Sequence, residues 1–194
     1  MNIALRDLTP TERTEVQLRF DALASKRFAP SGRKPRYEVW WPKAPLDARA
    51  FPEGLYPPEL GNEQFNESAR LIGFLNGVCP GEFYIANLSA PPPYFLHTGK
   101  LDEELCRWIR TRLVSNPTCL LSASADVLLI FDSSMRYSVI GGSPDVIDKL
   151  EKRFGGAEVL RKTFEDYVNE MHVGSGIDDV KWAQDHLIKW SGWV

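Results

Sequence analysis

The sequence has 194 residues, of which 43% are hydrophobic and 11% are aromatic, and its net charge is −3. A chain of this size and composition buries enough apolar surface to fold without a disulfide or a structural metal ion. Its longest apolar runs are far shorter than the roughly 18 residues of a membrane-spanning helix, and its first residues lack the pattern of a secretion signal, so we expect a cytoplasmic protein without membrane insertion.

Charge is unevenly distributed along the chain. Residues 1–43 carry nine Lys or Arg and five Asp or Glu, whereas residues 44–194 carry fourteen and twenty-one. Nucleic-acid binding draws its affinity from cations that neutralise phosphate groups, so the acidic excess disfavours nucleic acid as the main ligand. One basic cluster either binds an anion or forms a solvated helix end and loop, and it comprises Lys26, Arg27, Arg33, Lys34 and Arg36.

The N-terminal segment predicts a helix followed by a strand. Thr9 and Glu12 have the spacing of a capping box, with Pro10 at the first helical position. Apolar residues then recur at helical spacing, which predicts a helix over residues 10–28. Residues 36–40 alternate and are rich in strand-forming residue types, so we expect a strand there.

Residues 30–93 contain eleven of the fourteen prolines, which limits regular structure to the gaps between them. Because the segment also contains many aromatic residues and leucines, we expect an ordered loop region rather than a disordered linker. The widest gap between prolines predicts a helix over residues 63–76, and the next apolar run predicts a strand over residues 83–88.

The second half of the chain has the clearer pattern. Leucine or isoleucine recurs every four residues from Leu101 to Leu113, which predicts a helix. Three apolar runs follow, at residues 118–123, 127–131 and 137–140, and the short polar links between them favour an antiparallel meander. Strict alternation of strands and helices is missing, so we expect a single α+β domain over residues 1–194, with helices packed on an antiparallel sheet.

The stretch Gly141-Gly142-Ser143-Pro144 joins the last strand of this meander to a helix. Ser143 is predicted to cap the helix and Pro144 to begin it. A glycine pair before a helix can also expose amides to a phosphate group. The glycine motifs of known phosphate loops are missing from the sequence, and Asp145 and Asp148 would oppose an anion, so we interpret the glycines as a turn.

The same region resembles part of a known class of proteins. A strand from Leu129 to Asp132, an acidic turn, a strand ending at Val139-Ile140-Gly141-Gly142-Ser143 and a short helix to Phe154 resemble the closing segment of small bacterial immunity proteins, which neutralise secreted polymorphic toxins. The resemblance implies a cytosolic protein that binds one cognate toxin domain tightly, needs no cofactor and performs no chemistry.

Two sets of residues would suit a thiol- or metal-dependent hydrolase instead. Cys79 and His97 flank a predicted strand, and a thiol beside an imidazole is the minimum for nucleophilic catalysis. No third orienting group is evident, however, and cysteine is more often a small core residue. Possible metal ligands occur near the C-terminus, although helix capping explains the paired aspartates among them: His172, Asp178, Asp179, Asp185 and His186.

Four aromatic residues are candidates for contact with a partner protein. Tyr94 and Phe95 follow three prolines that favour an extended segment, and Trp190 and Trp193 lie near the C-terminus, where burial is harder. Core packing is the other interpretation of these residues. Aromatic anchors are typical of binding hot spots, so we expect all four to be exposed and to contact a cognate toxin encoded nearby. A structural or adaptor protein is a third possibility.

Overall fold

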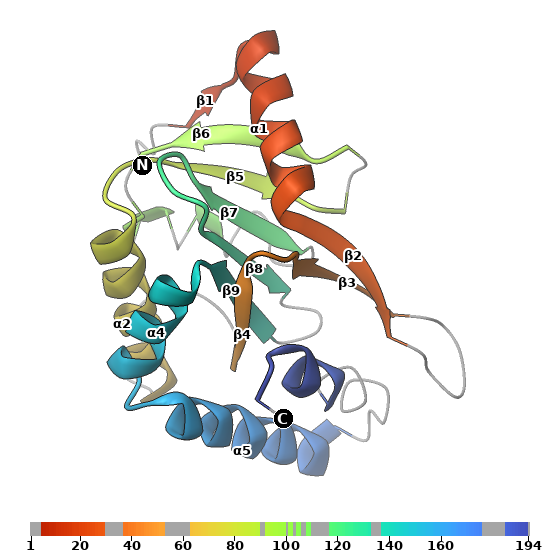
Figure 1. The fold of residues 1–194 in the computed structure, drawn as a ribbon, viewed down its shortest axis with the longest axis vertical. Coiled ribbons are helices and arrows are strands. Elements are labelled where there is room, and N and C mark those ends of the chain that lie inside the picture. The colour runs from red at the N-terminus through yellow and green to blue at the C-terminus, as the bar shows by residue number, and fades with distance from the viewer. Residues whose placement is uncertain are drawn as a thin grey trace.

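The computed structural model describes residues 5–29, 37–52, 63–89, 92–99, 117–132, 137–175 and 185–193, together with residues 101, 102, 104, 105, 108 and 109. Its main feature is a seven-stranded sheet in the order β1-β6-β5-β7-β8-β9-β4, in which every neighbouring pair is antiparallel (Figure 1). The strands are β1 (Arg6–Asp7), β4 (Asp47–Pro52), β5 (Phe83–Asn87), β6 (Tyr94–Thr98), β7 (Thr118–Ser122), β8 (Leu128–Asp132) and β9 (Tyr137–Gly142). The predicted α+β class and the antiparallel meander of β7, β8 and β9 are confirmed.

The first helix is shorter than predicted, because a strand replaces its second part. Helix α1 (Pro10–Leu23) begins with the predicted capping box, in which the Thr9 side chain accepts a hydrogen bond from the Glu12 amide. The chain turns into extended backbone at Ala24, and β2 (Ala24–Ala29) then pairs with β3 (Tyr37–Pro42) in a separate hairpin. The prediction of a helix over residues 10–28 is therefore wrong beyond Leu23, because strand pairing across the chain outweighs the local helical pattern.

The helices and the hairpin cover both faces of the sheet. On one face, Phe20 of α1 packs against Phe95 of β6, and the β2–β3 hairpin lies over β8 and β9 (Figure 1). On the other face, Arg49 and Phe51 of β4 contact α4 (Pro144–Arg153) and the residue that follows it. Other described helices are α2 (Glu63–Val78), which contacts α4, α5 (Ala157–Ser175), which contacts β4, and a short helix at residues 185–190.

The helix predicted over residues 63–76 is confirmed and ends at Val78. The predicted helix between Leu101 and Leu113 lies mostly outside the described residues. Residues 104, 105, 108 and 109 within it are helical, and Leu105 and Ile109 are buried. Among the described residues, no helix is both long and apolar enough to cross a membrane.

Gly141 and Gly142 are the last residues of β9 and pair with β4, so the interpretation of the glycines as a turn is wrong. The junction at residues 141–144 is instead a packing and capping site. A Cβ atom at Gly141 would lie 2.6 Å from Pro42 of β3, and one at Gly142 would lie 2.7 Å from Val146 of α4. Ser143 caps α4 by accepting a hydrogen bond from the Val146 amide at 3.4 Å. Because no larger residue fits at either glycine without a shift of its neighbours, close packing explains the glycine pair.

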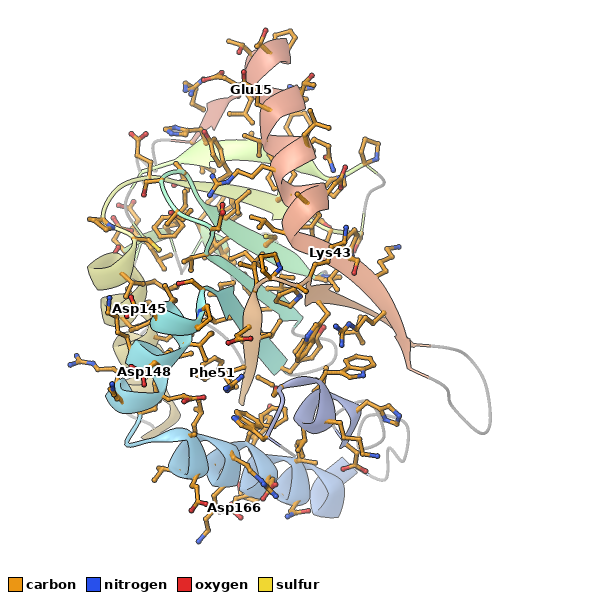
Figure 2. The ribbon with its side chains drawn as sticks, viewed as in Figure 1. Glu15, Lys43, Phe51, Asp145, Asp148 and Asp166 are labelled. Carbon is orange, nitrogen blue, oxygen red and sulfur yellow. The ribbon has the colours of Figure 1, made fainter. Side chains whose placement is uncertain are left out.

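Asp145 and Asp148 lie in the first part of α4 (Figure 2). Each forms an ion pair within the helix. The carboxylate of Asp145 lies 2.6 Å from Lys149, and that of Asp148 lies 2.5 Å from Lys152. These i,i+4 pairs are typical of an exposed helix face and contribute only a few tenths of a kcal/mol each. Asp145 and Asp148 therefore stabilise the helix.

Replacing Ser143 by alanine should lower the free energy of unfolding by about 0.5–2 kcal/mol, because one amide at the start of α4 loses its acceptor. Ser143→Asp keeps an oxygen at this position and should retain most of the stability. Urea denaturation of the three proteins measures the difference. Tight nucleotide binding by the wild type that Ser143→Ala loses would contradict the capping role.

The two edges of the large sheet differ in whether other parts of the chain cover them. The outer edge of β4 is covered, because the Ala50 amide donates to Ser191 Oγ at 3.0 Å and Arg49 donates to the Ser191 carbonyl at 2.8 Å. At the opposite edge, β1 has only two residues, and both are exposed. A short edge strand with charged side chains discourages pairing with another sheet, so this edge presents side chains to solvent.

Candidate protein-binding surface

Tyr94, at the start of β6, is the exposed aromatic residue at the β1 edge. The residue is 45% exposed. Its hydroxyl donates to Asp7 Oδ1 at 2.5 Å and accepts from Arg13 Nη2 at 3.2 Å. The Arg13 guanidinium also lies over the ring, 4.5 Å from its centroid. Two polar contacts and a cation–π contact therefore hold this ring in one orientation although the residue is exposed.

The register of the sheet explains how these three groups meet. Asp7 lies opposite Leu96, and Tyr94 and Leu96 point to the same face because side chains alternate along a strand. Arg13 lies in the first part of α1 and extends past the Leu8 carbonyl, which it also contacts at 3.5 Å. We refer to Asp7, Arg13 and Tyr94 together as the Tyr94 edge.

The hydroxyl of Tyr94 remains a hydrogen-bond donor at neutral pH. Its hydrogen bond to Asp7 raises the pKa of Tyr94, because ionisation would place a second negative charge beside the carboxylate. Burial adds to this effect, and Arg13 opposes it. The contact between Tyr94 and Asp7 therefore persists across the physiological pH range.

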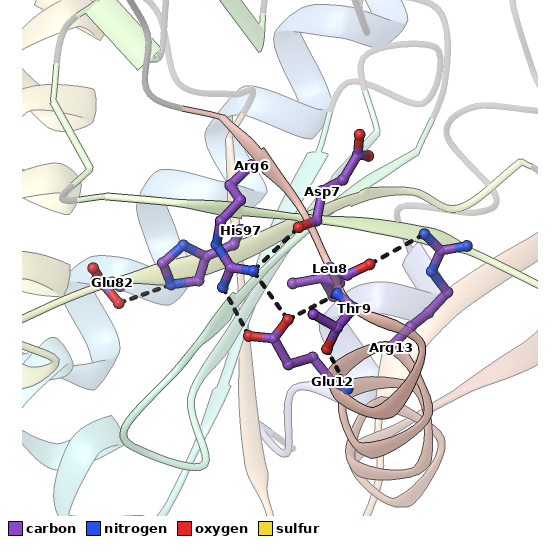
Figure 3. A network of polar contacts seen from close by, with 8 residues as sticks. All are labelled: Arg6, Asp7, Leu8, Thr9, Glu12, Arg13, Glu82 and His97. Atoms are coloured by element: carbon purple, nitrogen blue, oxygen red, sulfur yellow. Dashed lines mark hydrogen bonds and ion pairs between the residues drawn. The ribbon is translucent and has the colours of Figure 1, made fainter.

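A second polar network fixes β1 and α1 on the other face of the sheet (Figure 3). Arg6 donates to both carboxylate oxygens of Glu12, at 2.8 and 2.9 Å, and the Thr9 amide donates to the same carboxylate. The Arg6 hydrogen bonds and the capping contacts lower the pKa of Glu12 to about 2. This carboxylate therefore stays ionised and holds the strand that carries Asp7 against the helix that carries Arg13.

His97 of β6 also lies on this second face, where its Nε2 is 2.7 Å from Glu82. Its ring centroid is 5.5 Å from that of Tyr84, and its side chain is 15% exposed. Arg6, His97 and Tyr84 are aligned across β1, β6 and β5 by the strand register. The edge is thus lined by ordered polar groups on both faces.

The other three aromatic candidates are not exposed anchors. Phe95 is fully buried, with its ring centroid 5.4 Å from that of Phe20. Trp193 is 8% exposed and packs against Phe164. Trp190 is half-buried and packs against Trp41. The expectation that all four residues are exposed is therefore wrong for these three, because the sheet and the C-terminal helix turn their rings inward.

The residues considered for nucleophilic catalysis lie apart. The Cys79 thiol contacts the Ser122 hydroxyl, and Ser122 lies opposite Phe83 of β5. His97 lies opposite Tyr84, the next residue of β5. Because neighbouring strand residues point to opposite faces, the thiol and the imidazole lie on opposite faces of the sheet. Burial raises the pKa of Cys79, which keeps the thiol protonated.

The metal candidates lie largely outside the described side chains, including His172, Asp178 and Asp179. Asp185 is exposed, and the His186 ring centroid is 6.0 Å from that of Trp190. Within the part of the chain that the structure describes, no group of three or more His, Cys, Asp or Glu residues is arranged to hold a metal ion.

Two residues of the basic cluster contact tryptophans in and near the hairpin. Lys26 Nζ lies 5.5 Å from the Trp40 ring centroid, and the Arg27 guanidinium lies 5.4 Å from that of Trp190. Partial burial lowers the pKa of Arg27. These cations therefore have packing roles, and the other members of the cluster, Arg33, Lys34 and Arg36, lie outside the described residues.

Comparisons with protein-family models, curated proteins and solved structures find no match to this chain.

Proposed function

We propose that this chain is an immunity-type inhibitor, which binds a cognate bacterial toxin domain in a tight complex and performs no chemistry. The observation that carries the proposal is the exposed Tyr94 ring held in place by Asp7 and Arg13. Tyrosine and arginine are enriched among residues that dominate binding energy. A ring that is already ordered loses little conformational entropy when a partner covers it, so this arrangement favours affinity.

The Tyr94 edge differs from the other exposed apolar positions of the molecule. Among the described residues, the large hydrophobic side chains classed as exposed are Leu18, Tyr94 and Val159. Leu18 and Val159 are single aliphatic residues on helices, which are common on protein surfaces. Tyr94 combines exposure with fixed charged neighbours from two other elements, and this combination favours it as a contact residue.

The order of elements over residues 129–154, the segment that resembles part of an immunity protein, also favours the proposal. Strands β8 and β9 pair antiparallel and α4 follows them, which is the order of elements that the resemblance implies for the closing segment of an immunity protein. An adaptor protein would use the same edge to bind a partner. The two functions differ in the biological effect of binding, which a growth assay separates.

Expression of the neighbouring gene product in bacteria should arrest growth, and co-expression of this chain should restore it. Tyr94→Ala should weaken the complex about tenfold or more, which corresponds to about 1.4 kcal/mol, and should reduce protection at low expression. Val159→Ala is the matched control, because Val159 is similarly exposed but lies on α5. Binding without protection would favour an adaptor, and absence of both would contradict the proposal.

A further inference from the structure

The hydrogen-bonding capacity of the Tyr94 hydroxyl is directed inward. The hydroxyl donates to Asp7 and accepts from Arg13, so its single proton is already in use. Arg13 lies over one face of the ring, yet the residue remains 45% exposed. What Tyr94 offers to a partner is therefore aromatic surface rather than a free hydroxyl group.

Asp7 offers negative charge beside that aromatic surface. The residue is exposed, and its Oδ1 accepts the Tyr94 hydrogen bond. Within the described residues, no Lys or Arg side chain forms an ion pair with its carboxylate. The nearby Arg6 guanidinium is instead paired with Glu12. The second oxygen of Asp7 thus has capacity for a cation.

A carboxylate next to exposed aromatic surface suits a guanidinium group. The planar group forms strong hydrogen bonds with a carboxylate and stacks on an aromatic ring, whereas an ammonium group is more strongly hydrated and has no flat face. The Arg13 guanidinium already lies over the Tyr94 ring, 4.5 Å from its centroid. The negative charge of Asp7 offsets the repulsion between Arg13 and a second cation at this edge.

We infer that the partner presents an arginine side chain to the Tyr94 edge, paired with Asp7 and stacked on the open surface of Tyr94. The inference rests on the proposed function, because it names the chemistry that the toxin domain brings to this surface. It therefore predicts that the contact surface of the partner is basic.

The first test uses a hexa-arginine peptide as the probe and amide NMR shifts of the whole chain as the measurement. The largest shifts should fall at residues 6–13 and 94–97, and they should be at least halved by Asp7→Asn and by Tyr94→Leu. Glu158→Gln, which removes an exposed carboxylate from α5, should leave them unchanged. A hexa-glutamine peptide should cause no localised shifts.

Shifts spread evenly over the molecule, or shifts insensitive to Asp7→Asn, would overturn the inference. A second arm measures the association rate with the neighbouring gene product. Asp7→Asn should lower this rate several-fold at low salt and reduce its salt dependence, while Glu158→Gln should not. If the product binds but Asp7→Asn has no effect, the arginine contact is wrong and the proposed function stands. If the product does not bind, the proposed function is wrong. The NMR titration with the hexa-arginine peptide then tests by itself whether the Tyr94 edge binds arginine.

Discussion

Replacing Phe95 by alanine should lower the free energy of unfolding by about 3–5 kcal/mol. The ring is fully buried between the sheet and α1, where it contacts Phe20 edge-on. Removing it deletes a large apolar surface and leaves a cavity that a sheet cannot close by collapse. Guanidinium denaturation followed by circular dichroism measures the loss.

Tyr94→Ala provides the matched control, because it changes the adjacent residue of the same strand. This side chain is exposed, so its removal should cost about 1 kcal/mol or less, chiefly from the contacts with Asp7 and Arg13. A loss below 1 kcal/mol for Phe95→Ala would contradict its burial, and it would restore Phe95 as a candidate anchor.

Replacing Gly141 by alanine should destabilise the fold by about 1–3 kcal/mol, because the new methyl group has no room. A Cβ atom there would lie 2.6 Å from both Cβ and Cγ of Pro42. The proline ring is rigid and belongs to β3, so the hairpin must shift away from the sheet to relieve the clash. The same denaturation experiment should show the effect as a lower midpoint.

Gly73→Ala is the control for the loss of glycine itself. Gly73 lies inside α2, is exposed, and has no neighbouring atom within 4 Å of a Cβ position. Alanine should therefore stabilise the helix by about 0.5–1 kcal/mol. Equal effects of the two substitutions would refute the close approach of Pro42 to β9.

Elements with local signals could be predicted from the sequence. The capping box at Thr9 and the Ser143-Pro144 pair marked the starts of α1 and α4, since capping involves residues only a few positions apart. The meander of β7, β8 and β9 followed from three apolar runs joined by short links. Each of these features depends on residues that are neighbours in the chain.

Elements that depend on distant pairing could not be predicted in the same way. Strand β4 lies within the proline-rich segment and pairs with β9, far along the chain. Strand β2 continues directly from α1, and its extended form is stabilised by pairing with β3. Neither strand has a strong local pattern, so contacts across the fold decide their conformation.

The candidate site also depends on contacts that the local sequence does not show. Tyr94 and Phe95 are neighbours with similar side chains, and residue type alone gave both the same predicted role. Alternation along a strand places them on opposite faces, so one is exposed and the other buried. The contacts of Tyr94 with Asp7 and Arg13 join residues more than 80 positions apart, and no local signal marks them.

Isothermal titration calorimetry of the purified chain with the neighbouring gene product measures whether the chain binds a cognate toxin through the Tyr94 edge. We expect an equimolar complex whose dissociation constant rises about tenfold or more in Tyr94→Ala and stays unchanged in Val159→Ala. No binding by the wild-type chain would contradict the proposed function. Equal affinity of Tyr94→Ala and the wild type would contradict the assignment of the Tyr94 edge as the contact surface.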